Sequence, residues 1–182
     1  MLPNKIQAKL FIQSAVDLKG LIPVFHRWIQ EDALEGLLID VADYRHVPNG
    51  PGLLLMGHEG DYALDLADGR PGIVYKHKRD WPTDANTLET RLAIVLDRVQ
   101  QAAQLLRLQA DLIINEEEVE VRFPDRLTTL NTAESFSAVE SSLLADNGRI
   151  FGKQITDIAH ASADQRQSLA VLVQTEPVAE PV

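Results

Sequence analysis

The chain has 182 residues and a net charge of −10, and 45% of its residues are hydrophobic, which suits a soluble domain with a real core. With no cysteine, disulfides, thiolate metal sites and a cysteine nucleophile are excluded. The acidic balance argues against nucleic-acid and anionic-membrane partners. No apolar run of ~18 residues and no signal peptide stands out, so we expect a cytoplasmic protein without a membrane span.

The first part of the chain reads as a strand, a helix and a strand meander. Residues 5–13 alternate apolar and polar, which is typical of a half-buried strand. A helix is predicted to begin near Leu21, with Pro23 in its first turn, and to stop at Gly36. Residues 37–47 begin apolar on both faces, which favours a central strand. Three further strands complete the meander, over residues 53–58, 61–66 and 73–79.

The clearest element is a long helix over residues 86–110. Apolar residues follow one another at spacings of four and three through five turns, and Asn86 with Glu89 forms a capping box. We expect this helix to lie across its own sheet, because a sheet of five or more strands needs cover. A partner-facing coiled coil is the alternative.

The second part repeats the strand and helix pattern. A strand is predicted over residues 118–123, preceded by a solvated acidic turn at Glu116–Glu118. Asn131 and Glu134 are expected to cap a helix that ends at Asn147 and Gly148. Two more strands and a flexible tail follow, over residues 153–159, 168–174 and 175–182.

These elements predict an α+β fold. We expect a mainly antiparallel sheet of five to seven strands, covered by one long and two shorter helices, in a single domain over residues 1–174. Residues 1–80 and 112–174 share the order strand, helix, strand, strand, so they are candidate halves of a β-α-β-β pseudo-repeat joined by the long helix. The alternative is that both halves merely use a common unit. A real repeat would make the junction of the halves a candidate pocket.

Simple hairpin registers place the tyrosines and several histidines together. A turn centred on Gly50 sets Ala42 opposite His58, and a turn over residues 67–72 sets Tyr62 opposite His77. Asp61 then faces Lys78 as an ion pair on the other, solvated face. One face of the sheet would carry Asp40, Tyr44, His46, His58, Tyr62, Tyr75 and His77.

Two interpretations of this face stay open. The side chains can line the boundary of the core, with apolar bodies inward and polar tips outward. They can instead line a ligand-binding cleft in which Asp40 orients His58 and a tyrosine hydroxyl supplies a proton. The candidate ligand-binding residues are Asp40, Tyr44, His58, Tyr62, Tyr75 and His77.

Three segments of the first 80 residues carry a resemblance: IPVFHRWIQ, LLIDVADYRHVPNGPG and GHEGDY. Together they resemble a family of uncharacterised bacterial proteins. The resemblance implies a bacterial, cytoplasmic origin. It implies no activity, cofactor or site residue.

The leading functional hypothesis is a non-enzymatic or regulatory module that binds a small ligand or a protein partner in the Tyr/His-lined cleft, or that forms a homodimer through a sheet edge or a helix. No nucleophile-elbow, phosphate-loop, dinucleotide or HExxH motif is present, and no cofactor or metal is predicted. A partner site should expose an apolar patch around Phe25, Trp28 and Trp81.

Two alternatives remain. One is a hydrolase or lyase that uses His58 with Asp40, with a divalent metal completed by His46 or His77. The other is an assembly factor whose acidic surface selects a basic partner.

Overall fold

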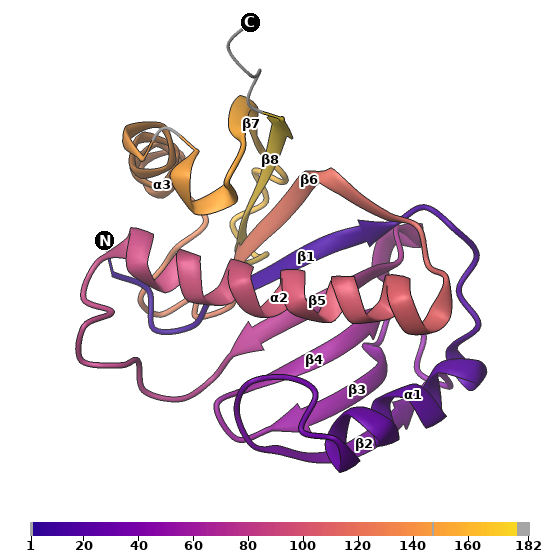
Figure 1. Cartoon of the computed structure of the whole chain (residues 1–182). Helices are drawn as coiled ribbons and strands as arrows, with labels where there is room; N and C mark the ends of the chain where they lie inside the picture. Colours follow the sequence, from indigo (N-terminus) through magenta and orange to yellow (C-terminus); the bar gives the residue numbers. More distant parts are fainter. Residues whose placement is uncertain (1, 147, 178–182) are drawn as a thin grey trace, which may run out of the picture.

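A computed structural model describes residues 2–146 and 148–177, and its strands form one antiparallel sheet in the order β2-β3-β4-β5-β1-β6-β8-β7 (Figure 1). The strands are β1 (Gln7–Ile12), β2 (Leu38–Tyr44), β3 (Gly52–Gly57), β4 (Gly60–Asp65), β5 (Gly72–His77), β6 (Ile114–Phe123), β7 (Gln154–His160) and β8 (Leu169–Glu176). The helices are α1 (Leu18–Gln30), α2 (Leu88–Ala110) and α3 (Ala133–Ala145), with 3-10 turns η1 (Ala67–Gly69) and η2 (Arg149–Phe151). The α+β class is confirmed, with eight strands in place of the predicted five to seven.

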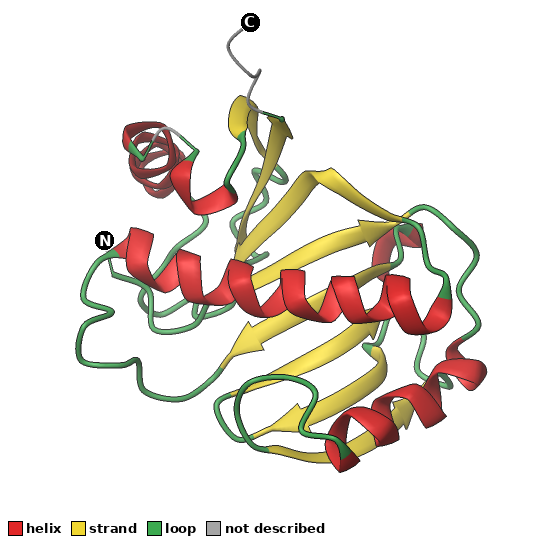
Figure 2. Ribbon diagram, viewed as in Figure 1, coloured by secondary structure: helices red, strands yellow, loops and turns green. Residues whose placement is uncertain are grey.

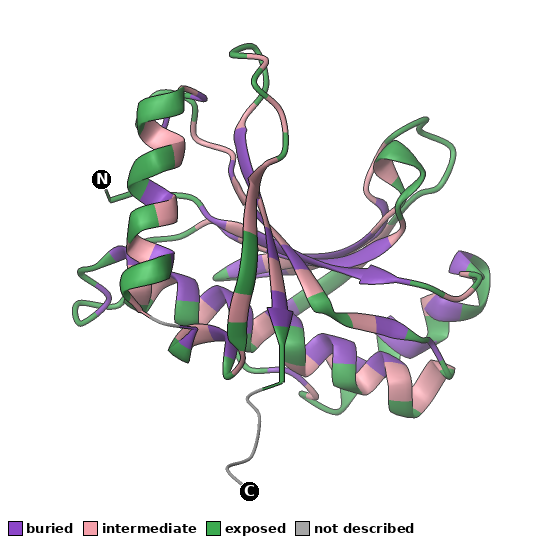
Figure 3. Cartoon of the chain, turned by 90° about the horizontal axis from the view of Figure 1, so that it is seen from above, coloured by how far each residue is buried: buried purple, intermediate pink, exposed green. Residues whose placement is uncertain are grey.

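The three helices cover one face of the sheet and leave the other open (Figures 2 and 3). The long helix α2 crosses the central strands and buries Leu92, Val95, Val99 and Leu106 in the core, so the prediction that it lies on its own sheet is confirmed. Its capping box is Thr87 with Thr90, one position after the predicted Asn86 and Glu89. In the described part of the chain, no helix has the length and hydrophobicity needed to cross a membrane.

Helix α1 begins earlier than predicted, because Asp17 caps it by accepting a hydrogen bond from the Lys19 amide at 3.1 Å. Pro23 therefore lies inside the helix and not in its first turn. Phe25 and Trp28 are fully buried with ring centroids 4.9 Å apart, and the Trp28 indole donates to Gln109 Oε1 at 2.9 Å. A partner site around these two residues would have left them exposed, but α1 buries both in the core.

Strand β2 lies at the edge of the sheet, although its apolar sequence predicted a central strand. Two aspartates bond the backbone at or beside this edge. Asp40 Oδ1 accepts the Val41 amide at 2.8 Å, and Asp43 Oδ1 accepts the Arg45 amide at 3.1 Å. The first bond occupies a backbone donor within β2 that an added strand could use, and the second holds the turn that follows Tyr44.

Strand β6 begins at Ile114 and includes the acidic run Glu116–Glu118, which was wrongly predicted to be a solvated turn. Cations hold these carboxylates in the strand. Glu116 pairs with Arg107, and Glu118 accepts from Arg70 at 2.8 Å. A charged run is thus compatible with a strand when its partners lie on neighbouring elements.

Strand β8 continues through Glu176, so the prediction of a tail from residue 175 is wrong for its first two residues. Residues 178–182 of that predicted tail lie outside the described residues. One sheet runs through both predicted halves, with β1 and β6 paired at its centre and β2 and β7 at its edges. This order is compatible with a repeat in which the β4–β5 hairpin is extra, and the duplication stays a prediction.

Asn131 ties the β6–α3 connection to the β7–β8 hairpin. Thr132, and not Asn131, caps α3, which ends at Ala145; the predicted stop at Asn147 lies outside the described residues. The buried Asn131 amide donates to the carbonyls of Ser162 and Asp164, both at 2.9 Å, and its oxygen lies 2.6 Å from His160 Nε2.

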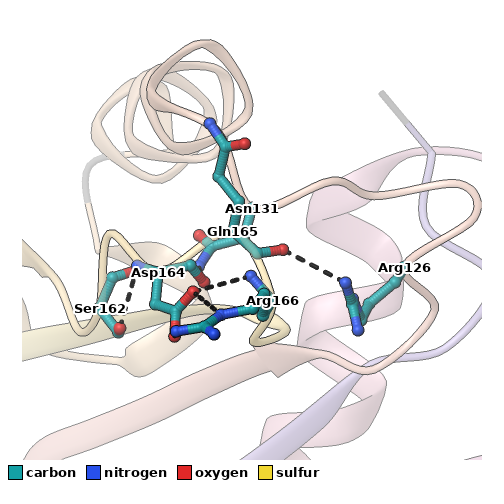
Figure 4. Close-up of polar contacts among 6 residues, drawn as sticks. All are labelled: Arg126, Asn131, Ser162, Asp164, Gln165 and Arg166. Atoms are coloured by element: carbon teal, nitrogen blue, oxygen red, sulfur yellow. Dashed lines mark hydrogen bonds and ion pairs between the residues drawn. The ribbon is translucent and has the colours of Figure 1, made fainter.

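Further hydrogen bonds stabilise the loop between β7 and β8. Asp164 bonds the backbone and guanidinium of Arg166, and Arg126 donates to the Gln165 carbonyl (Figure 4).

Replacing Asn131 with leucine should lower the free energy of unfolding by about 2–4 kcal/mol, because two partly buried carbonyls and His160 lose their hydrogen-bond partner. Urea denaturation measures this loss. The control Ser162→Ala keeps the accepting carbonyl and should cost less than about 1 kcal/mol. Equal losses in the two variants would show that the Asn131 bonds do not stabilise the fold.

Candidate functional site

The structure separates the predicted Tyr/His face into two groups. Ala42 pairs with Leu54 and Tyr62 with Tyr75, so both assumed registers are wrong. The β3–β4 hairpin pairs Leu55 with Tyr62, an odd residue with an even one. Side chains alternate along a strand, so this pairing turns Tyr62 towards the helices and leaves Asp40 on the opposite face.

Tyr62, Tyr75 and His77 do lie together, between the sheet and α2. The two tyrosine rings are 4.9 Å apart, and Tyr75 Oη lies 3.3 Å from His77 Nδ1. His77 also stacks on Trp81, with ring centroids 3.9 Å apart. All three predicted residues are at most 3% exposed, so they form a buried aromatic cluster and not an open cleft.

Burial controls the charge state of this cluster. It raises the pKa of Tyr75 to about 12 and raises that of Tyr62 further, so both hydroxyls stay neutral. Burial also lowers the pKa of His77 below its usual value, with Arg98 adding to the effect and Glu59 and two backbone carbonyls opposing it. Among the described atoms, Tyr62 Oη and His77 Nε2 have no hydrogen-bond partner. The cluster is therefore uncharged at neutral pH.

The other three predicted residues are scattered. Asp40 is exposed at the β2 edge. Tyr44 stacks on His46, with ring centroids 6.5 Å apart. His58 is half exposed in the β3–β4 turn, where Nδ1 lies 3.5 Å from Glu59 Oε1. Within the described ranges, no three His, Asp or Glu side chains lie close enough to share a metal ion. The geometry thus gives no support to a His58–Asp40 catalytic pair or to a metal site completed by His46 or His77.

A different set of residues lines a hollow of about 410 Å³ on the open face of the sheet. We call it the sheet-face pocket. Its floor comes from β4, β5, β1 and β6, and the turns that carry Asn49 and Asp68 form its rim. The lining residues used below are Gln7, Lys9, Asp61, Asp65, Lys76, Glu120 and Arg122.

Lys9 lies in the middle of this floor and is only 4% exposed. Its ammonium donates to Asp65 at 2.7 Å, and both side chains are largely shielded from water. An unpaired buried ammonium is very costly, so Lys9 depends on Asp65. Phe11 lies under the same layer, with the Arg70 guanidinium 3.7 Å from its ring centroid.

Most other charges on this face are also paired. Asp61 accepts from Lys78 at 2.7 Å, which is the predicted ion pair, although Lys76 and not Lys78 is its direct cross-strand neighbour. Glu120 pairs with Arg122 at 2.8 Å. These pairs leave the floor polar but nearly neutral.

Two charges remain at opposite ends of the pocket. Within the described residues, no carboxylate pairs with the Lys76 ammonium and no cation pairs with the Asp68 carboxylate. Asp68 has a left-handed backbone with φ +60°, which holds it on the rim in η1. The sheet-face pocket therefore offers one free cation and one free anion.

The sequence carries a signal for this pocket, although the same charges also predict a solvated surface. Lys9, Asp61, Asp65 and Lys76 all fall on the alternate positions that face away from the helices. Charges of both signs recur on that side of neighbouring strands. Their burial depends on partners far along the chain, which spacing alone does not reveal.

Comparison of the chain with protein-family models and with curated proteins found no match. The resemblance to a family of bacterial proteins therefore stays a prediction. The residues of the sheet-face pocket are the basis for a functional proposal.

The neutral His77 predicts a pH dependence of stability. A histidine whose folded pKa is lowered binds its proton more readily in the unfolded chain, so stability should fall as the pH drops below about 6.5. In His77→Phe this contribution should vanish, and the decline between pH 7 and 5 should be shallower. Urea denaturation across this range measures it.

The matched control is His26→Gln, because His26 is exposed on α1. It should keep the decline of the native chain. A His77→Phe curve parallel to the native one would contradict a buried neutral imidazole.

Proposed function

We propose that the protein is a non-catalytic module that binds a short peptide with free ends in the sheet-face pocket. The observation that supports this proposal is that two charges of the pocket have no ion-pair partner in the described part of the chain. Lys76 and Asp68 are the two lining charges that form no ion pair among the described residues. A ligand that brings a carboxylate to Lys76 and an ammonium to Asp68 would complete the pattern.

The spacing of these charges favours an extended ligand over a single amino acid. In the register of β4 and β5, Asp61 lies opposite Lys76 and Asp65 lies opposite Gly72. The position of Lys76 is therefore four residues, or ~13 Å along the strands, from the end of the hairpin that leads to Asp68. Three extended residues span about 10 Å. The flexible Lys76 side chain covers the remaining distance.

The lining groups favour binding over catalysis. Lys9, Asp65, Glu120 and Arg122 are each engaged by an ion pair, which makes them poor proton donors or nucleophiles at rest. The described lining contains no histidine, serine, threonine or tyrosine. Gln7 and Asn49 add neutral amide groups that suit a peptide backbone.

Titration with trialanine, measured by isothermal titration calorimetry, tests the proposal. The peptide with both ends free should bind, and acetylating the amine or amidating the carboxylate should each weaken binding by about tenfold or more. Lys76→Met should weaken binding of the free peptide by a similar factor, and so should Asp68→Asn.

Lys19→Met is the matched control, since Lys19 is an exposed cation on α1, away from the open face. It should bind trialanine like the native chain. Equal binding of free and doubly capped trialanine, or equal affinity in Lys76→Met and Lys19→Met, would reject the proposed ligand class.

A further inference from the structure

A second hollow, of about 530 Å³, lies where the N-terminal segment meets the connection between β5 and α2. We call it the Trp81 hollow. Its charged lining residues are Lys5, Lys78, Arg79, Arg91, Asp80 and Asp125, and neutral polar groups come from Asn4, Thr83 and Asn86.

Two side chains build the walls of this hollow. The Trp81 indole donates to the Asn4 carbonyl at 2.9 Å. Arg91, which projects from α2, donates to the carbonyls of Pro3 at 2.7 Å and Ala85 at 2.9 Å. These bonds hold the N-terminal segment against the connection, so the hollow is a fixed feature of the fold.

Cations without a carboxylate partner gather here. Nine of the 17 Lys and Arg side chains pair with a described carboxylate, which leaves eight. Three of these eight, Lys5, Arg79 and Arg91, line the Trp81 hollow. Lys78 also lines it but is engaged by Asp61. Arg79 and Arg91 donate only to backbone carbonyls among the described acceptors, so their charges are not neutralised.

The two acidic residues of the hollow do not cancel this excess. Asp80 and Asp125 contribute two negative charges against the three unpaired cations, so the lining keeps an excess of positive charge. The chain as a whole carries −10, but salt screens charges beyond ~8 Å at physiological ionic strength. The local cations therefore dominate inside the hollow.

From this concentration of unpaired cations we infer that the Trp81 hollow binds a small dianionic oxyanion, either inorganic phosphate or a phosphate monoester. Lysine and arginine with nearby amide and hydroxyl donors match phosphate oxygens in charge and geometry. A larger polyanion is disfavoured, because the part of it outside the hollow would meet a chain with a net charge of −10.

Isothermal calorimetry with inorganic phosphate and with glycerol 3-phosphate, at constant ionic strength, tests this inference. Both probes should bind, and the tighter one identifies the source of the phosphate group. Lys5→Gln and Arg79→Gln each remove one charge at the surface of the hollow and should weaken binding about fivefold. The double variant should weaken it by more than either single change.

Intrinsic fluorescence supplies a second readout. The chain has two tryptophans, and Trp28 is fully buried on α1, so a phosphate-dependent change should be lost in Trp81→Phe.

The control Lys19→Gln removes a distant cation and should leave phosphate binding unchanged, and so should Lys76→Met in the sheet-face pocket. Absence of heat and of a fluorescence change with both probes would overturn the inference. Native affinity in the Lys5→Gln and Arg79→Gln double variant would overturn it as well, since binding would then lie elsewhere.

Discussion

All three helices lie on one face of the sheet, so the other face must protect its own backbone and small apolar side chains from water. It does so with long charged side chains that lie over the floor in pairs. The ion pair between Lys9 and Asp65 is central to this arrangement, because it places an ammonium where the sheet is almost closed to solvent. Removing one partner of such a pair typically costs about 3–5 kcal/mol. The open face is therefore part of the stable structure.

The same use of charged side chains recurs elsewhere in the fold. Asp40 occupies a backbone donor of β2, Asp43 occupies one in the turn that follows, and Arg91 fastens the N-terminal segment through backbone carbonyls. Each group satisfies the backbone where no neighbouring layer or strand does so. The two hollows are the places where this pairing is incomplete. One presents a separated cation and anion, and the other presents an excess of unpaired cations, so we assign them ligands of different charge.

Local patterns in the sequence predicted most of the elements but not how they meet. Alternation identified β1, and the four-and-three spacing identified α2, because both depend on residues close in sequence. The edge position of β2 and the register of its hairpin depend on turn geometry. The β3–β4 turn sets a register in which Tyr62 lies opposite Leu55. Tyr62 therefore shares a face of the sheet with Leu55, and Asp40, which lies opposite Met56, is on the other face. The buried state of Lys9 depends on Asp65, which no local pattern reveals.

The position of β1 in the sheet has a consequence for how the chain folds as it is synthesised. β1 is made first but pairs with β5 and β6, and β6 begins only at Ile114. At ~5–20 residues per second, about 100 residues take roughly 5–20 s to follow. During this interval Ile6, Leu10 and Ile12 have no strand on one side and no α2 above them. The nascent chain thus exposes an aggregation-prone apolar strand until its second half emerges. A chaperone that shields the nascent chain would act on β1 first.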